Sequence, residues 1–113
     1  MLKPVLREKK RYLAFEILSK SKLSFTAIKN AILTSCQQFL GQLGMAHAGI
    51  IILGDNFNKE KQKGLIRVNN KYVNELKASL ALIKKINNKT VIIKSLGVSG
   101  ILKKAYNKYI KGG

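Results

Sequence analysis

The sequence has 113 residues, of which 22 are lysine or arginine and five are aspartate or glutamate, so its formal net charge is +17. Its 46% hydrophobic residues argue against disorder, and no segment approaches the ~20 uninterrupted apolar residues that a membrane helix requires. The single cysteine excludes an internal disulfide, and with one histidine it cannot form a metal site. We therefore expect one domain over residues 1–113 with no metal or cofactor of its own.

The first half of the chain contains two predicted strands and a long helix. Residues 11–18 alternate apolar and polar side chains, which is typical of a strand with one covered face. Apolar residues then recur every three or four positions over residues 25–43, which predicts a helix that ends at Gly41 and Gly44, with Cys36 on its apolar face. The run AGIIILGDN predicts a second strand, covered on both faces.

The second half is predicted to add a strand, a helix, a strand and a final helix. The two strands are residues 64–70 and the run TVIIKS, and the helix between them can be capped by Asn69 or Asn70. The final helix is residues 100–110. The order β-α-β-β-α-β closes into a four-stranded antiparallel sheet with two helices on one face. We therefore expect an α+β, ferredoxin-like sandwich, which is the topology of the RNA-recognition motif, with an added C-terminal helix.

The predicted third strand lacks the rings with which an RNA-recognition motif stacks bases. That motif runs Lys/Arg-Gly-aromatic-small-aromatic-Val, whereas this chain reads KGLIRV, with Leu65 and Arg67 in place of the rings. Tyr12, the one ring on the polar side of the first strand, is expected to pack under the terminal helix. Because stacking contributes ~1–3 kcal/mol per base, binding is expected to depend instead on lysine–phosphate contacts and to be strongly salt-dependent.

Three basic segments supply the candidate RNA-binding residues. They precede and enter the first strand, lead into the third strand, and lie on the last helix, and a polyanion would relieve the mutual repulsion of so many cations. The candidates are Arg7, Lys9, Lys10 and Arg11; Lys59, Lys61, Lys63 and Arg67; and Lys103, Lys104 and Lys108. Adaptation to solubility or to salt is the alternative explanation of this charge.

The stretch GVSGILKK, which begins at Gly97, has two compatible interpretations. Gly97, Ser99 and Gly100 are predicted to form the turn between the fourth strand and the last helix. The free N–H groups at the start of that helix, together with Lys103 and Lys104, also suit an RNA phosphate.

The sequence predicts no catalytic residue. Its five acidic residues show no paired spacing, and His47 is expected at a helix end rather than as a base. Glu16 is expected to be structural, with a cationic or hydrogen-bonding partner where it is covered. An acylphosphatase of ferredoxin-like fold is an enzymatic alternative, but the segment SKSKLS after the first strand contains no glycine for an anion-binding loop.

Three stretches in the same order resemble the archaeal ribonuclease P protein component 2 family. They are REKKRYLAFEIL, GLIRVNNKYVNELKASLALI and SLGVSGILKKAYNKYI, and they cover nearly the whole chain. That family is related to a small protein subunit shared by eukaryotic ribonuclease P and ribonuclease MRP. Ile101 stands where the family often has threonine, so a hydroxyl contact is not expected at this position.

The resemblance implies a subunit of the ribonucleoprotein that removes the 5′ leader from precursor tRNA. In that endoribonuclease the RNA is the catalyst and uses bound Mg²⁺, while the protein supports the RNA. The implied partners are the ribonuclease P RNA, the TIM-barrel-like component 3, a second copy by self-association of the protein pair, and precursor tRNA as the holoenzyme substrate.

The sequence also leads to an expectation about the location of the protein and to an alternative function. A cytoplasmic location is expected, because the basic N-terminal segment shows no signal peptide. A different small basic ribonucleoprotein component, such as a ribosome-associated RNA-binding protein, is the alternative function.

Overall fold

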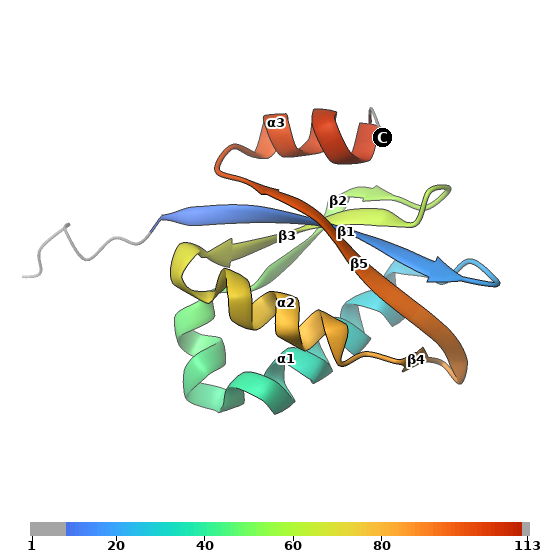
Figure 1. The fold of residues 1–113 in the computed structure, drawn as a ribbon, viewed down its shortest axis with the longest axis horizontal. Helices are drawn as coiled ribbons and strands as arrows, with labels where there is room; N and C mark the ends of the chain where they lie inside the picture. Colours follow the sequence, from blue (N-terminus) through green and yellow to red (C-terminus); the bar gives the residue numbers. More distant parts are fainter. Residues whose placement is uncertain (1–8, 112–113) are drawn as a thin grey trace, which may run out of the picture.

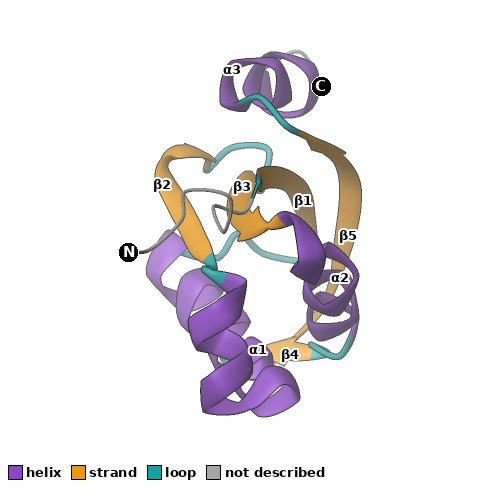
Figure 2. Ribbon diagram, turned by 90° about the vertical axis from the view of Figure 1, so that its left-hand side faces the viewer, coloured by secondary structure: helices purple, strands orange, loops and turns teal. Residues whose placement is uncertain are grey.

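The computed structural model describes residues 9–111, which form an α+β arrangement with helices on both faces of an antiparallel sheet (Figures 1 and 2). Helices α1 and α2 cover one face, and α3 with its π-helical continuation η3 covers part of the other. Within residues 9–111 no helix is long and apolar enough to cross a membrane. The elements are β1 (Lys10–Ser19), α1 (Phe25–Ala48), β2 (Ile51–Asn58), β3 (Lys63–Asn69), η2 (Asn70–Tyr72), α2 (Val73–Ala81), β4 (Lys85–Ile86), β5 (Lys89–Ser99), α3 (Leu102–Ala105) and η3 (Tyr106–Lys111).

The sheet has five strands in the order β2-β3-β1-β5-β4, one strand more than predicted. The additional strand, β4, pairs with the start of β5 across a two-residue turn, in which Asn87 and Asn88 have φ angles of 53° and 67°. Asparagine tolerates this left-handed backbone. The asparagine pair therefore closes a tight hairpin, and the sequence analysis predicted no strand before it.

The fourth predicted strand is longer than the run TVIIKS. Strand β5 extends to Ser99, because β1 offers pairing partners as far back as Tyr12. A register shift in the ladder inserts Leu96 as an extra residue on β5. Gly97 lies inside the strand, opposite Ala14, so its predicted place in the turn is wrong.

Helix α1 also differs from the prediction. Ser24 caps its start, with a side chain that accepts a backbone N–H of the first turn. Gly41 has a non-helical backbone (φ 74°, ψ 176°), so α1 consists of two helical segments that meet at a kink there. The helix ends at Gly49, which has a left-handed φ of 59° and donates its N–H to the carbonyl oxygen of Met45. The first helical segment therefore ends at Gly41, as predicted, whereas Gly44 lies inside a second segment that continues to Ala48.

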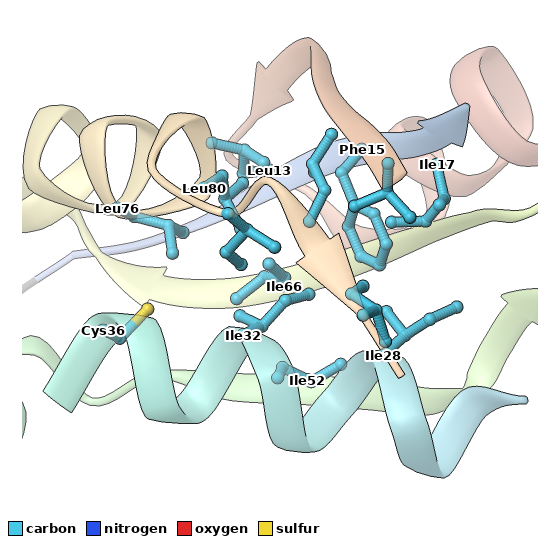
Figure 3. Packing of buried hydrophobic residues seen from close by; sticks show 14 of the residues in the cluster. Leu13, Phe15, Ile17, Ile28, Ile32, Cys36, Ile52, Ile66, Leu76 and Leu80 are labelled. Carbon is cyan, nitrogen blue, oxygen red and sulfur yellow. The ribbon is translucent and has the colours of Figure 1, made fainter. Parts of the chain in front are cut away.

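The main core lies between the sheet and helices α1 and α2. The apolar side of β1 points toward these helices (Figure 3). The central side chains are Leu13, Phe15, Ile17, Ile28, Ile32, Ile66, Leu76 and Leu80. Cys36 is fully buried on the apolar face of α1, as predicted, and this burial raises the pKa of its thiol. The thiol is therefore protonated and unreactive at neutral pH.

A second, smaller core lies between the opposite face of the sheet and the C-terminal helix. It consists of Ala14 and Leu65 from the sheet and Ala105 and Ile110 from the helix, all fully buried. Tyr12 packs against this cluster, which confirms that it lies under the terminal helix. The centre of this face is thus closed to stacked bases.

Candidate nucleic-acid interface

Among the residues that the structure describes, few carboxylates are available to pair with the many cations. Between described residues one ion pair forms, in which Lys22 contacts Glu60, and both side chains are exposed. The ammonium group lowers the pKa of the Glu60 carboxyl. No three His, Cys, Asp or Glu side chains within residues 9–111 lie close enough to hold a metal ion. The positive surface of the described domain is therefore suited to polyanions.

The first group of cations, the turn cluster, consists of Arg11, Lys103 and Lys104. Arg11 lies beside the turn between β5 and α3, because a Cβ placed on Gly100 would lie 3.1 Å from Arg11 Nη1. Lys103 and Lys104 follow this turn in the short helix α3, and both are exposed. The fold thus brings the start of β1 to the start of α3, although about 90 residues separate them in the sequence.

The other candidates near the start of β1 lie apart from the turn cluster. The Lys10 ammonium is near the end of α1, since a Cβ on Gly49 would lie 3.4 Å from Lys10 Nζ. A cation there is favourable, because the carbonyl groups at a helix C-terminus carry partial negative charge. Lys9 is exposed, and its carbonyl oxygen accepts the N–H of Asn70. Arg7 lies outside the described residues.

The second group of cations, the hairpin cluster, lies where the β2–β3 hairpin meets the end of η3. The Lys61 ammonium donates to the Lys111 carbonyl oxygen at 3.5 Å and so joins the two elements. Lys108 lies on η3, with its Nζ 5.4 Å from the ring centroid of Tyr109. The members of the hairpin cluster are Lys59, Lys61, Lys63, Lys108 and Lys111.

Gln62 fixes the position of this hairpin. It is buried, has a positive φ of 54°, and its side-chain amide donates to the carbonyl oxygens of Leu23 and Lys59. Its side-chain oxygen accepts the N–H of Leu23. Because every polar atom of the buried amide has a partner, the hairpin is held against the segment between β1 and α1. The neighbouring lysines are thus presented from a fixed backbone.

Arg67 does not belong to the hairpin cluster, although the sequence grouped it with Lys63. It lies four residues further along β3 and pairs with Tyr12 of β1 and Ile51 of β2. Its Nε is buried and has no hydrogen-bond partner among the described residues. At about 3.3 Å per residue, Arg67 lies more than 10 Å from Lys63 along the strand, toward the turn cluster.

The turn before α3 is formed by Gly100 and Ile101. The Ser99 hydroxyl accepts the N–H of Ile101 and donates to its carbonyl oxygen, both at 3.2 Å. This hydroxyl is thus used within the turn. Gly97 has a packing role instead, because a Cβ there would overlap the Tyr109 hydroxyl.

The sequence did not single out one lysine that the sheet brings beside the candidates. Lys94 of β5 and Lys63 of β3 both pair with Glu16 of β1, so two cations flank this half-buried carboxylate from the neighbouring strands. Alternation within VIIKS was the available signal, since Lys94 is out of phase with the buried residues Val91 and Ile93.

Comparisons with known proteins agree along almost the whole chain. Ribonuclease P protein component 2 of Pyrococcus furiosus is 39% identical over 109 residues, which is 96% of this chain and 89% of the relative. The protein of the same name from Methanosarcina mazei is 37% identical over 110 residues, with 97% and 91% covered.

A solved structure has the same fold. A chain in the cryo-EM structure of yeast ribonuclease MRP superimposes with a TM-score of 0.65 at 12% identity, covering 94% of this chain and 88% of that one. The model of the Rpp14/Pop5 family matches residues 11–110. With this match and the identity to the archaeal relatives, the chain belongs to the Rpp14/Pop5 family.

Proposed function

We propose that this protein is a subunit of ribonuclease P, where it binds and stabilises the RNA that removes the 5′ leader from precursor tRNA. The observation that carries the proposal is the identity of 35–39% to archaeal proteins named ribonuclease P protein component 2, over nearly their full length. The same observation favours this function over another small basic ribonucleoprotein component. As a holoenzyme subunit the chain contributes to endonuclease activity, while the RNA performs the chemistry.

The two cationic clusters suggest how the chain assists the RNA. Folding a catalytic RNA brings phosphates together against strong repulsion, and fixed ammonium and guanidinium groups lower that cost. The turn cluster and the hairpin cluster lie at opposite ends of the α3–η3 helix, on a rigid sheet. We propose that both contact the RNA backbone, and that the RNA, not the protein, holds the Mg²⁺ that activates water.

The proposed protein partner is a component 3-type subunit, and the surface assigned to it is on the helix side. A groove of about 560 Å³ lies between α1 and the segment after α2. Phe39 and Leu82 line it and are 47% and 58% exposed. Covering such side chains is favourable. A partner there leaves the C-terminal helix free for RNA. Self-association of the resulting pair and precursor tRNA as the substrate complete the proposed assembly.

Two finer assignments belong to the same proposal. The strand order β2-β3-β1-β5 is that of a ferredoxin-like sandwich, so we describe the fold as this sandwich extended by the β4 hairpin. We assign the protein to the cytoplasm, together with its RNA.

The Mg²⁺ requirement of the reconstituted enzyme tests the function. The catalytic RNA, the component 3-type subunit and either the wild-type chain or the variant Lys103→Gln/Lys104→Gln are assayed for precursor tRNA cleavage across a Mg²⁺ titration. The variant is expected to need more Mg²⁺ for half-maximal cleavage, because two fixed cations are missing. The matched control is Lys29→Gln/Lys77→Gln, which removes two exposed lysines from α1 and α2.

Three results would contradict the proposal. The first is a wild-type chain that does not support cleavage, and the second is RNA-free chain that cleaves alone. The third is native protein that copurifies with ribosomal RNA rather than with ribonuclease P RNA, which would assign it to the alternative ribonucleoprotein.

A further inference from the structure

The C-terminal helix covers only part of the sheet face on which it lies. Tyr109 lies over Gly97, Ile110 packs with Leu65, and the helix ends where Lys61 binds the carbonyl oxygen of Lys111. Strands β1 and β5 continue beyond this point as an arm (Figure 1). Strand β3 does not flank the arm, because the β1–β3 ladder ends where Glu16 pairs with Lys63, and the short strand β4 pairs with residues 89 and 90 of β5 on the other edge. Part of the face therefore stays open to solvent.

The side chains on this open part follow from the strand alternation. Ile17, Val91 and Ile93 point into the main core, so their neighbours along the strands point the other way. We name the resulting surface the open sheet face; its members are Glu16, Leu18, Lys63, Ile92 and Lys94. They form two rows across the strands, Lys63–Glu16–Lys94 and Leu18–Ile92.

The second row extends into a groove at the end of the arm. The groove has a volume of about 610 Å³ and is formed by residues 18–21 and 89–92. Its lining residues are two lysines, three residues with hydroxyl groups and three aliphatic residues: Lys20 and Lys89, Ser19, Ser21 and Thr90, and Leu18, Val91 and Ile92. No acidic side chain lines it.

The charge of this surface indicates an anionic ligand. Four lysines belong to the open sheet face and its groove, against the single carboxylate of Glu16. Within residues 9–111 the next acid along the hairpin, Glu60, is already paired with Lys22. The hydroxyl groups can donate to phosphate or ribose oxygens as well.

The apolar residues of this surface distinguish a single strand from a duplex. Leu18 and Ile92 lie opposite each other and are 44% and 63% exposed, so the groove has an apolar floor between its cations. An A-form duplex presents phosphates and 2′-hydroxyls, while its base faces are stacked inside. Only an unpaired nucleotide can place a base on the aliphatic pair while its phosphates reach the lysines.

We propose that the open sheet face and its groove bind an unpaired segment of RNA, with phosphates on Lys63, Lys94, Lys20 and Lys89 and a base on Leu18 and Ile92. This proposal rests on the proposed function, since it assigns a binding mode to a chain that acts on a folded RNA. According to this proposal the two surfaces bind different features of the RNA. The turn cluster contacts backbone without regard to strandedness, whereas the open sheet face selects single strands.

The test compares single-stranded and duplex RNA. Two probes are used, an oligouridylate of about twelve nucleotides, which is within the range of known single-strand sites, and a duplex of the same length. Ile92→Thr is expected to weaken single-strand binding about fivefold and duplex binding less than twofold, because the base contact is lost. Lys94→Gln is expected to lower the slope of log affinity against log salt by about 0.7 on the single strand.

Matched controls come from the helix side of the molecule. Leu43→Thr removes an exposed aliphatic side chain from α1, and Lys77→Gln removes an exposed lysine from α2. Both are expected to bind either probe as the wild type does. Thermal unfolding of each variant verifies that the fold is intact.

Several results would overturn the inference. One is that both Ile92→Thr and Lys94→Gln bind the single strand with the affinity of the wild type. Another is that Ile92→Thr weakens binding to the single strand and to the duplex by the same factor. A third is unchanged RNA binding by Ile92→Thr with loss of binding to the component 3-type subunit, which would assign the face to a protein. In each case the wild type still supports precursor cleavage if the proposed function holds, so the two failures are separable.

Discussion

The Tyr109 hydroxyl lies where a side chain at residue 97 would begin, so β5 can pass beneath η3 only as glycine. Gly100 differs, because a side chain there would meet the mobile end of Arg11 at 3.1 Å and not a packed ring. The two glycines are three residues apart and belong to one short motif. Gly97 allows the C-terminal helix to pack on the sheet, and Gly100 allows the Arg11 guanidinium to approach the turn.

Substitution of these glycines by alanine should therefore have unequal effects. Gly97→Ala is expected to lower the free energy of unfolding by about 1–3 kcal/mol, because the added methyl group must displace the Tyr109 ring. Gly100→Ala, the matched control, is expected to stay within about 0.5 kcal/mol of the wild type, since Arg11 can move. Urea titrations of both proteins give the comparison. Equal stability of the two variants would contradict the role assigned to Gly97.

The C-terminal helix is held by a small core of its own. This smaller core has four fully buried residues, whereas the main core on the other side of the sheet has sixteen buried residues. Segments with few buried apolar contacts open at lower free energy than the rest of a domain. Since this helix joins the turn cluster to the hairpin cluster, its docking determines whether the two act as one rigid surface.

Ile110→Ala tests the docking of this helix. The lost side chain is fully buried in the smaller core, so the helix is expected to loosen by about 2 kcal/mol or more. Hydrogen exchange should accelerate for amides of residues 102–111, while those of Leu13 and Ile66 stay protected. Leu76→Ala, a truncation in the main core, is the control and should accelerate exchange throughout. Uniform acceleration by Ile110→Ala would show instead that the two cores unfold together.

The order of the predicted elements is correct because it depends on periodicity, which is local. The errors arise where contacts with distant parts of the chain determine the secondary structure. Strand β5 is longer than its apolar run because β1 offers pairing as far as Tyr12, and β4 exists only because residues 89 and 90 lie opposite. Gly41 interrupts α1 as predicted, but a second helical segment follows it as far as Ala48, whose side chain is fully buried.

The composition of the chain predicted the kind of partner, but not which cations lie together on one surface. Seventeen net positive charges with few acids predict a polyanion partner in any fold. Which cations share a surface depends on register. Arg67 separates from Lys63 along β3, and Lys94 joins Lys63 only because both pair with Glu16. Contacts of this kind, between strands far apart in the sequence, cannot be read from a single sequence.

The separation of the turn cluster and the hairpin cluster has an energetic consequence. Lys104 and Lys111 lie seven residues apart on the helix between them, about 10 Å at the usual rise per residue, which exceeds the Debye length of ~8 Å at physiological salt. Charges this far apart interact weakly through solvent, so their contributions to RNA binding should add.

Additivity can be measured with two double variants and their combination. Lys103→Gln/Lys104→Gln and Lys59→Gln/Lys111→Gln are each expected to lower the salt slope of binding to the catalytic RNA by nearly two, if each lost phosphate contact counts about 0.9 as on duplex DNA. The quadruple variant should lower it by the sum, while Lys29→Gln/Lys77→Gln should leave it unchanged. An unchanged slope in either double variant removes that cluster from the interface. A quadruple effect below the sum means that both clusters compete for the same phosphates, which the rigid spacing of the helix does not allow.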